Sequence, residues 1–247
     1  MAGDGAGDAG QRVKEESSET RFYLTPPHPC SYLPDRTAQT MFLDPREAVA
    51  TELYTVLSNQ GFRRSGAHLY RPRCEGCTAC IPSRIPVAAF APNRSQRRAS
   101  RRNADLRYVL TTAEYSPEVF ALYERYVAAR HRDGDMYPAS PDQFKSFLLC
   151  HWSETFFLRA YLEDTLMAVA VLDRLDDGLS AIYTFFDASD ERRSLGKQMI
   201  LEEIALCRKL NLPYLYLGYW VNGADKMRYK TDFKPVELFV NGFWSRQ

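Results

Sequence analysis

Residues 156–186, FFLRAYLEDTLMAVAVLDRLDDGLSAIYTFF, contain three successive runs that are rich in aromatic and β-branched residues. The runs cover 156–163, 166–174 and 179–186, and an Asp-Gly pair, which is a strong hairpin signal, separates the last two. Runs of this length and composition predict strands, and the short connections between them favour antiparallel pairing. The stretch therefore predicts a three-stranded antiparallel meander at the centre of the fold.

A helix and another strand follow the meander. Apolar residues recur at three-to-four spacing through 194–210, which predicts a helix, and the run 214–219 predicts a strand. Because a strand, a helix and a second strand in that order normally form a right-handed parallel unit, strand 214–219 is expected beside strand 179–186. A short helix at 222–230 and strands within 236–243 are expected to complete the chain.

The segment before the meander is equally regular. Residues 106–112 predict a strand, and Ser116 and Ser140, each followed by proline, predict the N-caps of two helices. The resulting order of elements resembles that of the GNAT N-acyltransferases, whose central strands splay apart to hold an acyl donor and an amine acceptor. The fold class that this resemblance implies is α/β, with a GNAT-like acyltransferase domain and a central mixed sheet over 106–247.

The first 105 residues differ in composition from this regular domain. Residues 1–20 are rich in Gly, Ala, Ser and acidic residues, which predicts a disordered tail. Residues 21–105 combine many prolines with short apolar pieces, and we expect a small N-terminal module rich in cysteine and arginine. The sequence has no run of eighteen apolar residues and no apolar core of a signal peptide, so we expect a cytoplasmic protein without a membrane partner.

Positive charge is concentrated in one part of the chain. Between residues 61 and 107, eleven arginines stand against two acidic residues, a net charge of +9 in a chain whose total is +1. Five of these arginines recur at helical spacing within 93–103, so a helix there would align them into a stripe suited to phosphates. An ordinary solvated surface is the alternative interpretation of such a run. The candidates for binding the phosphates of a nucleic acid are Arg94, Arg97, Arg98, Arg101 and Arg102.

Four cysteines form a candidate metal site. Cys74, Cys77 and Cys80 make a CxxCxxC run, and Cys30 lies upstream of it. Thiolates at this spacing can converge on one ion, and Cys30 would supply a fourth ligand to zinc or an iron–sulfur cluster. The sequence lacks the second CxxC pair that would strengthen a zinc assignment, so free thiols are the alternative.

Two further segments carry candidate binding residues. The segment 191–197 lies where GNAT enzymes place the R/Q-x-x-G-x-G/A loop for the coenzyme A pyrophosphate, but Gln198 stands where Gly or Ala is required. This departure argues against coenzyme A and leaves an anion site for an RNA 3′ end as the alternative. The second segment, 214–233, mixes aromatic and cationic residues where the strands would splay. The candidates for substrate binding are Arg193, Ser194, Gly196, Trp220, Lys226, Arg228, Tyr229 and Lys230.

Seven strings together carry a resemblance to one family. They are CSYLP (30–34), YRPRCEGCTACIPSRIPV (70–87), NRSQRR (93–98), YTFFD (183–187), RRSLGK (192–197), LPYLYLGYW (212–220) and KMRYKTDFKP (226–235). They resemble the bacterial aspartate/glutamate leucyltransferases, which are relatives of the eukaryotic arginyl-tRNA protein transferases. The resemblance implies an aminoacyltransferase that moves leucine from leucyl-tRNA to the N-terminus of proteins beginning with Asp or Glu. Such transfer marks those proteins for N-end-rule degradation.

The implied reaction needs little from the protein. An aminoacyl ester is already activated, so transfer requires no cofactor, only an amine held against the ester carbonyl and a stabilised oxyanion. Side chains near the splay are expected to orient the amine or relay its proton. These candidates are Tyr183, Asp187 and Tyr219. A cation is expected to pair with the carboxylate of the acceptor side chain. The candidates for that role are Lys226, Arg228 and Lys230.

Other interpretations stay open at this point. The eukaryotic relatives pair a CGYC-like motif with a later cysteine pair at a metal or iron–sulfur site, and here Leu33 stands at the second cysteine of that motif. An acyl-coenzyme A N-acetyltransferase would need a complete pyrophosphate loop and no arginine stripe. A metal-binding module that binds RNA or senses redox state, without catalysis, is the second alternative. No residue pattern distinguishes leucine from arginine as the donated amino acid.

Overall fold

The computed structural model describes residues 20–247, with the side chains of Asp225 and Lys226 excepted. The tail expected at 1–20 therefore lies outside the described residues, apart from its last position. No helix in this described part is both long enough and apolar enough to cross a membrane.

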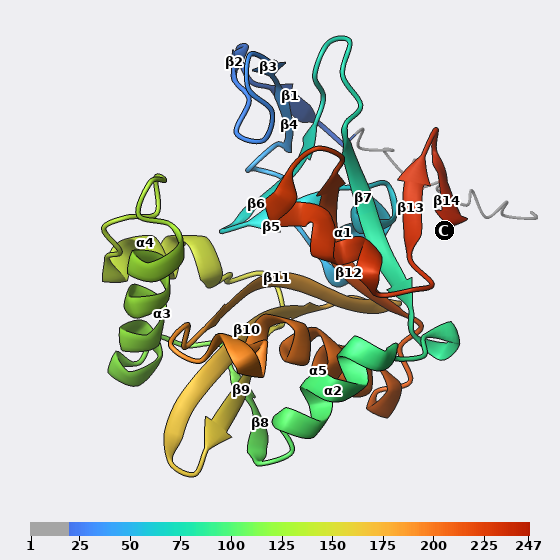
Figure 1. Cartoon of the computed structure of the whole chain (residues 1–247). Helices are drawn as coiled ribbons and strands as arrows, with labels where there is room; N and C mark the ends of the chain where they lie inside the picture. Colours follow the sequence, from blue (N-terminus) through green and yellow to red (C-terminus); the bar gives the residue numbers. More distant parts are fainter. Residues whose placement is uncertain (1–19) are drawn as a thin grey trace, which may run out of the picture.

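The chain first builds a small antiparallel sheet, whose strands pair in the order β1-β4-β6-β5, and a separate β2–β3 pair. These elements lie in the upper half of Figure 1, with β1 to β4 above β5, β6 and the helix α1. Their bounds are β1 (Phe22–Leu24), β2 (His28–Pro29), β3 (Thr37–Ala38), β4 (Thr40–Leu43), α1 (Thr51–Asn59), β5 (Arg63–Ser65) and β6 (His68–Pro72).

The rest of the chain builds an eight-stranded sheet with flanking helices. Its strands are β7 (Cys80–Pro86), β8 (Leu106–Thr112), β9 (Thr155–Leu162), β10 (Thr165–Arg174), β11 (Gly178–Phe186), β12 (Tyr214–Val221), β13 (Glu237–Val240) and β14 (Phe243–Arg246). Its α-helices are α2 (Arg94–Arg102), α3 (Pro117–Arg130), α4 (Pro141–Leu148) and α5 (Leu195–Lys209). Its 3-10 helices are η1 (Val87–Ala89), η2 (Glu191–Arg193) and η3 (Asp225–Asp232).

The large sheet is mixed, and its strands follow the order β14-β13-β7-β12-β11-β10-β9-β8. The expected meander is confirmed, because β10 pairs antiparallel with both β9 and β11. The expected parallel unit is confirmed as well, because β11 and β12 run parallel on either side of α5 in the chain. The short helix expected at 222–230 is instead the 3-10 helix η3. The mixed α/β class follows from these pairings.

Strand β7 comes from the cysteine- and arginine-rich part of the chain, 21–105, yet it lies inside the large sheet between β12 and β13. Its residues Cys80 to Pro86 pair antiparallel with β12, and Ser83 and Arg84 also pair with β13. The N-terminal part and the C-terminal strands therefore complete one sheet together.

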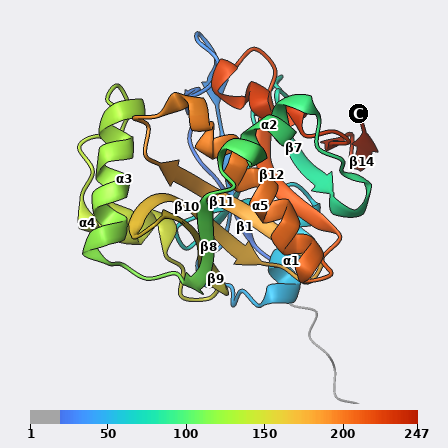
Figure 2. The same cartoon turned by 60° about the horizontal axis from the view of Figure 1, so that its bottom comes forward.

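Alternation along β10 divides the core into two layers, because successive side chains of a strand point to opposite faces of the sheet. Ala168, Ala170 and Leu172 pack into the cluster that contains the inner face of α5. Val169 and Val171 pack on the other face with residues of α3 and α4. Figure 2 shows α3 and α4 at one end of the molecule, away from α5 and α2.

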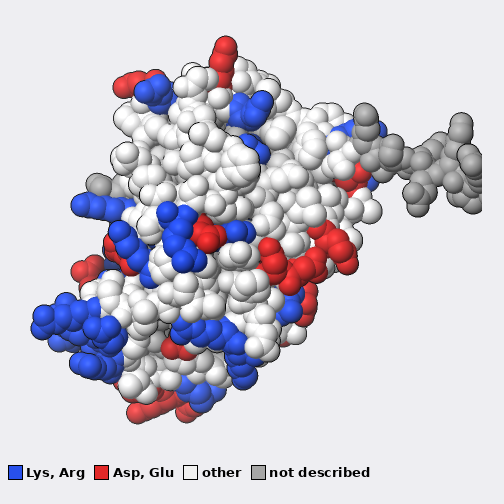
Figure 3. Space-filling model, turned by 90° about the vertical axis from the view of Figure 1, so that its right-hand side faces the viewer, with Lys and Arg blue, Asp and Glu red and all other residues white. Residues whose placement is uncertain are grey.

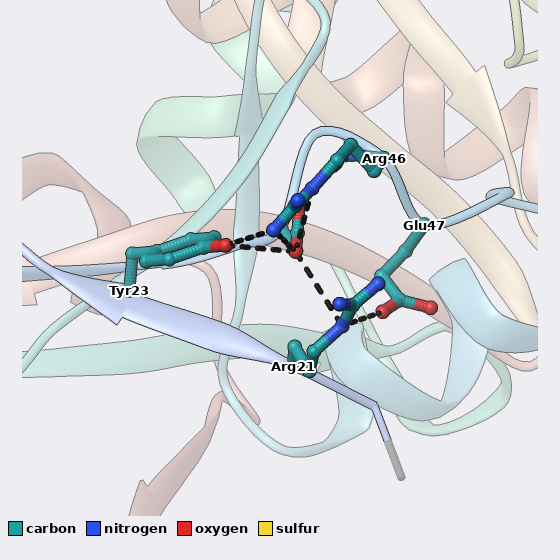
Figure 4. A network of polar contacts seen from close by, with 5 residues as sticks. Arg21, Tyr23, Arg46 and Glu47 are labelled. Carbon is teal, nitrogen blue, oxygen red and sulfur yellow. Dashed lines mark hydrogen bonds and ion pairs between the residues drawn. The ribbon is translucent and has the colours of Figure 1, made fainter. Parts of the chain in front are cut away.

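A polar network ties the first strand to the loop that leads into α1. The carboxylate of Asp44, which is 1% exposed, accepts hydrogen bonds from Tyr23 at 3.0 Å and from Arg46 Nη2 at 2.8 Å. Arg21 lies 3.5 Å from the same carboxylate and also bonds Glu47 (Figure 4). The hydrogen bond from Arg46 holds the pKa of Asp44 well below its usual range. The carboxylate is therefore ionised at neutral pH and anchors β1.

A buried ion pair joins the small sheet to the large one. Arg64 on β5 makes two hydrogen bonds to Asp173 on β10, and both side chains are fully buried. Asp173 also accepts hydrogen bonds from Tyr54 of α1 at 2.9 Å and from Thr155 of β9 at 2.7 Å. Every oxygen of this carboxylate is thus satisfied by donors from separate elements.

The pair gives a test of how the two sheets are held together. Arg64→Met should reduce the free energy of unfolding by about 3–5 kcal/mol, because it leaves the Asp173 carboxylate buried without a cation. Urea unfolding of the wild type and the variant measures this loss. Adding Asp173→Asn to Arg64→Met should recover part of it, since the remaining group is neutral. A loss below ~1 kcal/mol would contradict the role given to the pair.

Candidate active site

Strands β11 and β12 pair only over a short stretch. Gly178–Ser180 lies beside Tyr214–Tyr216 in parallel register, and no pairing between the two strands is found beyond it in the described chain. After that point β11 continues along β10 as far as Phe186, whereas β12 continues along β7 as far as Val221. The register shift between Tyr216 and Gly218 turns β12 away. The strands therefore splay, and helix η3 packs against β12 beside the opening.

The three residues predicted to act on the amine lie apart. Tyr183 on β11 belongs to an aromatic group with Tyr123 and Tyr126, and burial raises the pKa of its hydroxyl. Tyr219 on β12 is 4% exposed and donates a hydrogen bond to the carbonyl of Gly61 at 2.8 Å. No hydrogen bond or ring contact joins Tyr183, Tyr219 and Asp187 to one another within the described residues.

Asp187 has the most accessible position of the three. It follows β11 directly and lines a hollow of about 220 Å³ with the start of α5. The backbone N–H of Ser189 donates to its carboxylate at 2.8 Å, and hydrogen bonding with Ser189 lowers the pKa of the carboxyl. Asp187 is therefore a carboxylate at neutral pH and can accept a hydrogen bond.

The segment 191–197, which was expected to bind an anion, makes its polar contacts with other parts of the chain. Arg193 makes two hydrogen bonds to Asp105, at 2.8 and 2.9 Å, which raise the pKa of the guanidinium. Ser194 has a positive φ of 53° and caps α5 without a side-chain hydrogen bond. A side chain at Gly196 would begin 3.1 Å from the ring of Phe186, which is a tight contact. Arg193 thus fixes the loop to the end of α2.

The remaining candidates for substrate binding lie at the end of β12 and along helix η3. Trp220 and Arg228 line a hollow of about 360 Å³. Tyr229 is 45% exposed as a residue, whereas Lys230 is 5% exposed and points inward. The side chain of Lys226 lies outside the described part of the structure. The structure therefore separates these candidates into a surface group and one buried cation.

Lys230 is a buried cation. Its ammonium donates a hydrogen bond to the carbonyl of Tyr219 at 2.6 Å, and no described carboxylate forms an ion pair with it. Burial, and then the positive charge of Arg63, lower the pKa of Lys230 to about 7. The ammonium is therefore poised to lose its proton near neutral pH unless an anion is present.

Two charged residues near the splay were not among the candidates from the sequence, namely Arg63 on β5 and Glu203 on α5. Glu203 is fully buried, and its only hydrogen bond within the described residues is a long one of 3.5 Å from Thr184. Burial raises the pKa of Glu203 to about 8. Glu203 stands four residues from Met199 and from Cys207, among the apolar residues that recur through 194–210. A charged residue at such a position was the signal that could have identified it.

The arginine run forms the exposed side of α2. Asn93 caps this helix with a complete capping box to Gln96, and the inner face consists of the buried Gln96 and Ala99. All five predicted arginines are exposed, and none forms an ion pair with a described carboxylate. In Figure 3, clusters of Lys and Arg lie in the lower half of the molecule, at the height of α2 in Figure 1. Helix α2 is therefore a cationic surface element.

Three of the four cysteines, Cys74, Cys77 and Cys80, line a hollow of about 690 Å³ together with Tyr219. Burial and the charges of Cys30, Cys74 and Cys77 raise the pKa of Cys80 to about 11. Among residues 20–247, however, no three His, Cys, Asp or Glu side chains converge closely enough to hold a metal ion. As placed here, these thiols do not fit a metal centre.

The structure thus combines a mixed sheet that opens beside buried charges with an exposed arginine helix, in a protein of the α/β class. Two family models match the chain, namely "Arginine-tRNA-protein transferase, N terminus" over residues 28–98 and "Arginine-tRNA-protein transferase, C terminus" over residues 118–240. The chain belongs to this family.

The curated relatives place the chain among the aspartate/glutamate leucyltransferases of this family. The protein of that name from Hahella chejuensis is 54% identical over 90% of this chain and 95% of its own length. The one from Pseudomonas paraeruginosa is 52% identical over 93% of this chain and 97% of its own length. The one from Alcanivorax borkumensis is 50% identical over 93% of this chain and 95% of its own length.

Solved structures give only loose overlaps. The C-terminal domain of a putative lysylphosphatidylglycerol synthetase from Agrobacterium fabrum has a TM-score of 0.48 and 14% identity, covering 68% of this chain and 58% of that one. L-PGS from Bacillus licheniformis has a TM-score of 0.46 and 6% identity, covering 58% of this chain and 46% of that one. At these scores neither likeness defines the fold of this chain.

The buried carboxyl of Glu203 leads to a pH-dependent prediction. Its pKa of about 8 in the fold lies above the ordinary 4.5, so the folded state holds more protons than the unfolded state between these values. The free energy of unfolding should therefore fall as the pH rises from 5 to 8, by on the order of 1 kcal/mol per pH unit.

Glu203→Gln removes this titration, so its stabilising effect in urea unfolding should be larger at pH 8 than at pH 5. Glu124→Gln, the same change on the exposed side of α3, is the matched control for loss of a carboxylate. An equal effect of Glu203→Gln at both pH values would show that the carboxyl is not held protonated.

Proposed function

We propose that this chain transfers leucine from leucyl-tRNA to the N-terminus of proteins that begin with Asp or Glu, marking them for N-end-rule degradation. The observation that carries the proposal is the match to aspartate/glutamate leucyltransferases at 50–54% identity over nearly the whole length of both proteins. A cationic helix, and a splayed sheet beside the buried cation Lys230, which forms no ion pair with a described carboxylate, support a tRNA donor and an acidic acceptor.

The reaction joins two substrates without an added cofactor. The α-amine of the acceptor, whose pKa is ~8 when unperturbed, attacks the ester carbonyl of leucyl-tRNA as the neutral amine. A carbon–nitrogen bond forms, the bond from the carbonyl carbon to the ribose oxygen breaks, and the amine proton ends on that oxygen. Positioning of the two groups and stabilisation of the oxyanion supply the rate enhancement.

The GNAT-like arrangement is part of this proposal. The splay between β11 and β12 supports this arrangement. The two strands pair in parallel only at Gly178–Ser180 and then separate, which leaves an opening between them. Asp187, at the end of β11, accepts a hydrogen bond from the α-amine in this scheme. The hydroxyls of Tyr183 and Tyr219 are turned toward Met136 and Gly61, so their part is to shape the wall of the opening. Lys230 pairs with the acceptor carboxylate.

Helix α2 binds the phosphates of the donor in the proposed complex. Its five exposed arginines face solvent, and Arg102 and Arg193 link its end to the loop before α5. This contact places the cationic surface next to the segment that leads into α5. Recognition of a folded RNA by shape and phosphate contacts suits such a surface.

Transfer of labelled amino acid tests the function directly. Leucyl-tRNA, arginyl-tRNA and acetyl-coenzyme A are each offered as donors to peptides that begin with Asp, Glu, Arg or Ala. Labelling from leucyl-tRNA onto the Asp and Glu peptides alone is the expected result. Labelling from arginyl-tRNA would show that arginine is the donated amino acid. Labelling from acetyl-coenzyme A alone would show that the protein is another class of acyltransferase.

Replacing Arg94, Arg98 and Arg101 together by Gln tests the role of α2. We expect the KM for leucyl-tRNA to rise ~10-fold or more and its salt dependence to weaken, because phosphate contacts are lost. The preference among acceptor peptides should not change. Arg107→Gln, an exposed arginine on the edge strand β8, is the matched control. An unchanged KM and salt dependence would remove α2 from the tRNA interface.

A further inference from the structure

Two consecutive arginines on β5 have opposite environments. Arg64 is neutralised by Asp173, and all of its contacts lie inside the core. Arg63 is 4% exposed, yet its Nε and Nη1 atoms have no hydrogen-bond partner among the described residues. Its Nη2 donates to the carbonyl of Ser83 at 3.2 Å, and the guanidinium lies 5.2 Å from the ring centre of Tyr216. A buried cation with two free donors is costly unless an anion joins it.

Arg63 and Lys230 face the same empty position. Gly218 on β12 has a φ of 83°, and a side chain there would begin 3.4 Å from Lys230 Nζ and 4.0 Å from Arg63 Nε. Apart from the chain neighbours of Gly218, no other atom lies within 4 Å of that point. Two cationic nitrogens from β5 and η3 therefore border one atom-sized gap on the splayed strand.

The gap lies beside the openings that a substrate could use. Tyr219, whose carbonyl holds the ammonium of Lys230, also lines the hollow of about 690 Å³. On the other side, Arg228 and Thr231 flank Lys230 along η3 and line the hollow of about 360 Å³. No described carboxylate pairs with either Arg63 or Lys230. The described residues thus leave the anion of this site to a ligand.

We propose that Arg63, together with Lys230, binds the side-chain carboxylate of the acceptor's N-terminal Asp or Glu in the gap beside Gly218. This inference rests on the proposed function and adds to it the residue that determines acceptor specificity. A guanidinium with two free donors in a fixed plane suits a carboxylate, and the ammonium supplies a second charge. Asparagine and glutamine side chains have the same shape but no charge, so the two cations would stay uncompensated.

Acceptor discrimination in full-length protein tests this role. Peptides that begin with Asp, Glu, Asn or Gln are offered with saturating leucyl-tRNA to the wild type, Arg63→Gln, Arg63→Lys and the exposed control Arg107→Gln. Arg63→Gln should lower kcat/KM for the Asp and Glu peptides by on the order of 10- to 100-fold, mainly through KM. It should leave the low values for Asn and Gln peptides unchanged, so that the discrimination ratio collapses.

Two further readouts separate specificity from folding. The Tm of Arg63→Gln should equal or exceed that of the wild type, because an unpaired buried charge is removed. Arg63→Lys keeps the charge with fewer donors, so its discrimination should fall between those of the wild type and Arg63→Gln, and this variant stands in if Arg63→Gln does not fold. The KM for leucyl-tRNA should be unchanged in both variants.

The outcomes distinguish this inference from the function on which it rests. If the wild type transfers no leucine to any peptide, the proposed function fails. If the wild type transfers leucine but Arg63→Gln keeps its preference for Asp over Asn, the inference alone is overturned. A raised KM for leucyl-tRNA with unchanged acceptor preference would also overturn it, because the gap would then receive a group of the donor.

Discussion

The buried ion pair between Arg64 and Asp173 is the interaction on which the arrangement of this protein depends. It joins β5 of the small sheet to β10 of the large one, and Asp173 also receives hydrogen bonds from α1 and β9. Burial of opposite charges is favourable only when each is fully compensated. The pair therefore allows essentially one placement of the N-terminal sheet against the large sheet.

The same pair determines where its neighbour lies. Because side chains alternate along a strand, fixing Arg64 against Asp173 directs Arg63 to the other side of β5. There Arg63 contacts β7 and β12, near Ser83 and Tyr216, and forms no ion pair with an acidic residue of the described chain. The small sheet thus carries a charged side chain into the opening of the large sheet, and this accounts for a site built from both parts.

The splay of the large sheet gives the two proposed substrates separate approaches. Strand β11 leads to Asp187 and the start of α5, and the loop there is held against α2 by Arg193. Strand β12 leads to Lys230 and the gap beside Gly218, behind the hollow lined by cysteines. A large anionic donor approaching over α2 and a small acidic acceptor approaching from β12 would meet where the strands separate.

The sequence by itself determined the meander, the parallel unit and the exposed arginine helix, because periodicity of apolar residues depends only on local spacing. Its motifs were also sufficient to identify the family. Only the tertiary structure decided the environments of Arg63, Lys230 and Glu203, and the place of β7 inside the large sheet. The arginines of β5 look alike in sequence, yet the partner that separates them lies 109 residues away, at Asp173. Burial and pairing of charge are set by such distant contacts, which no local pattern records.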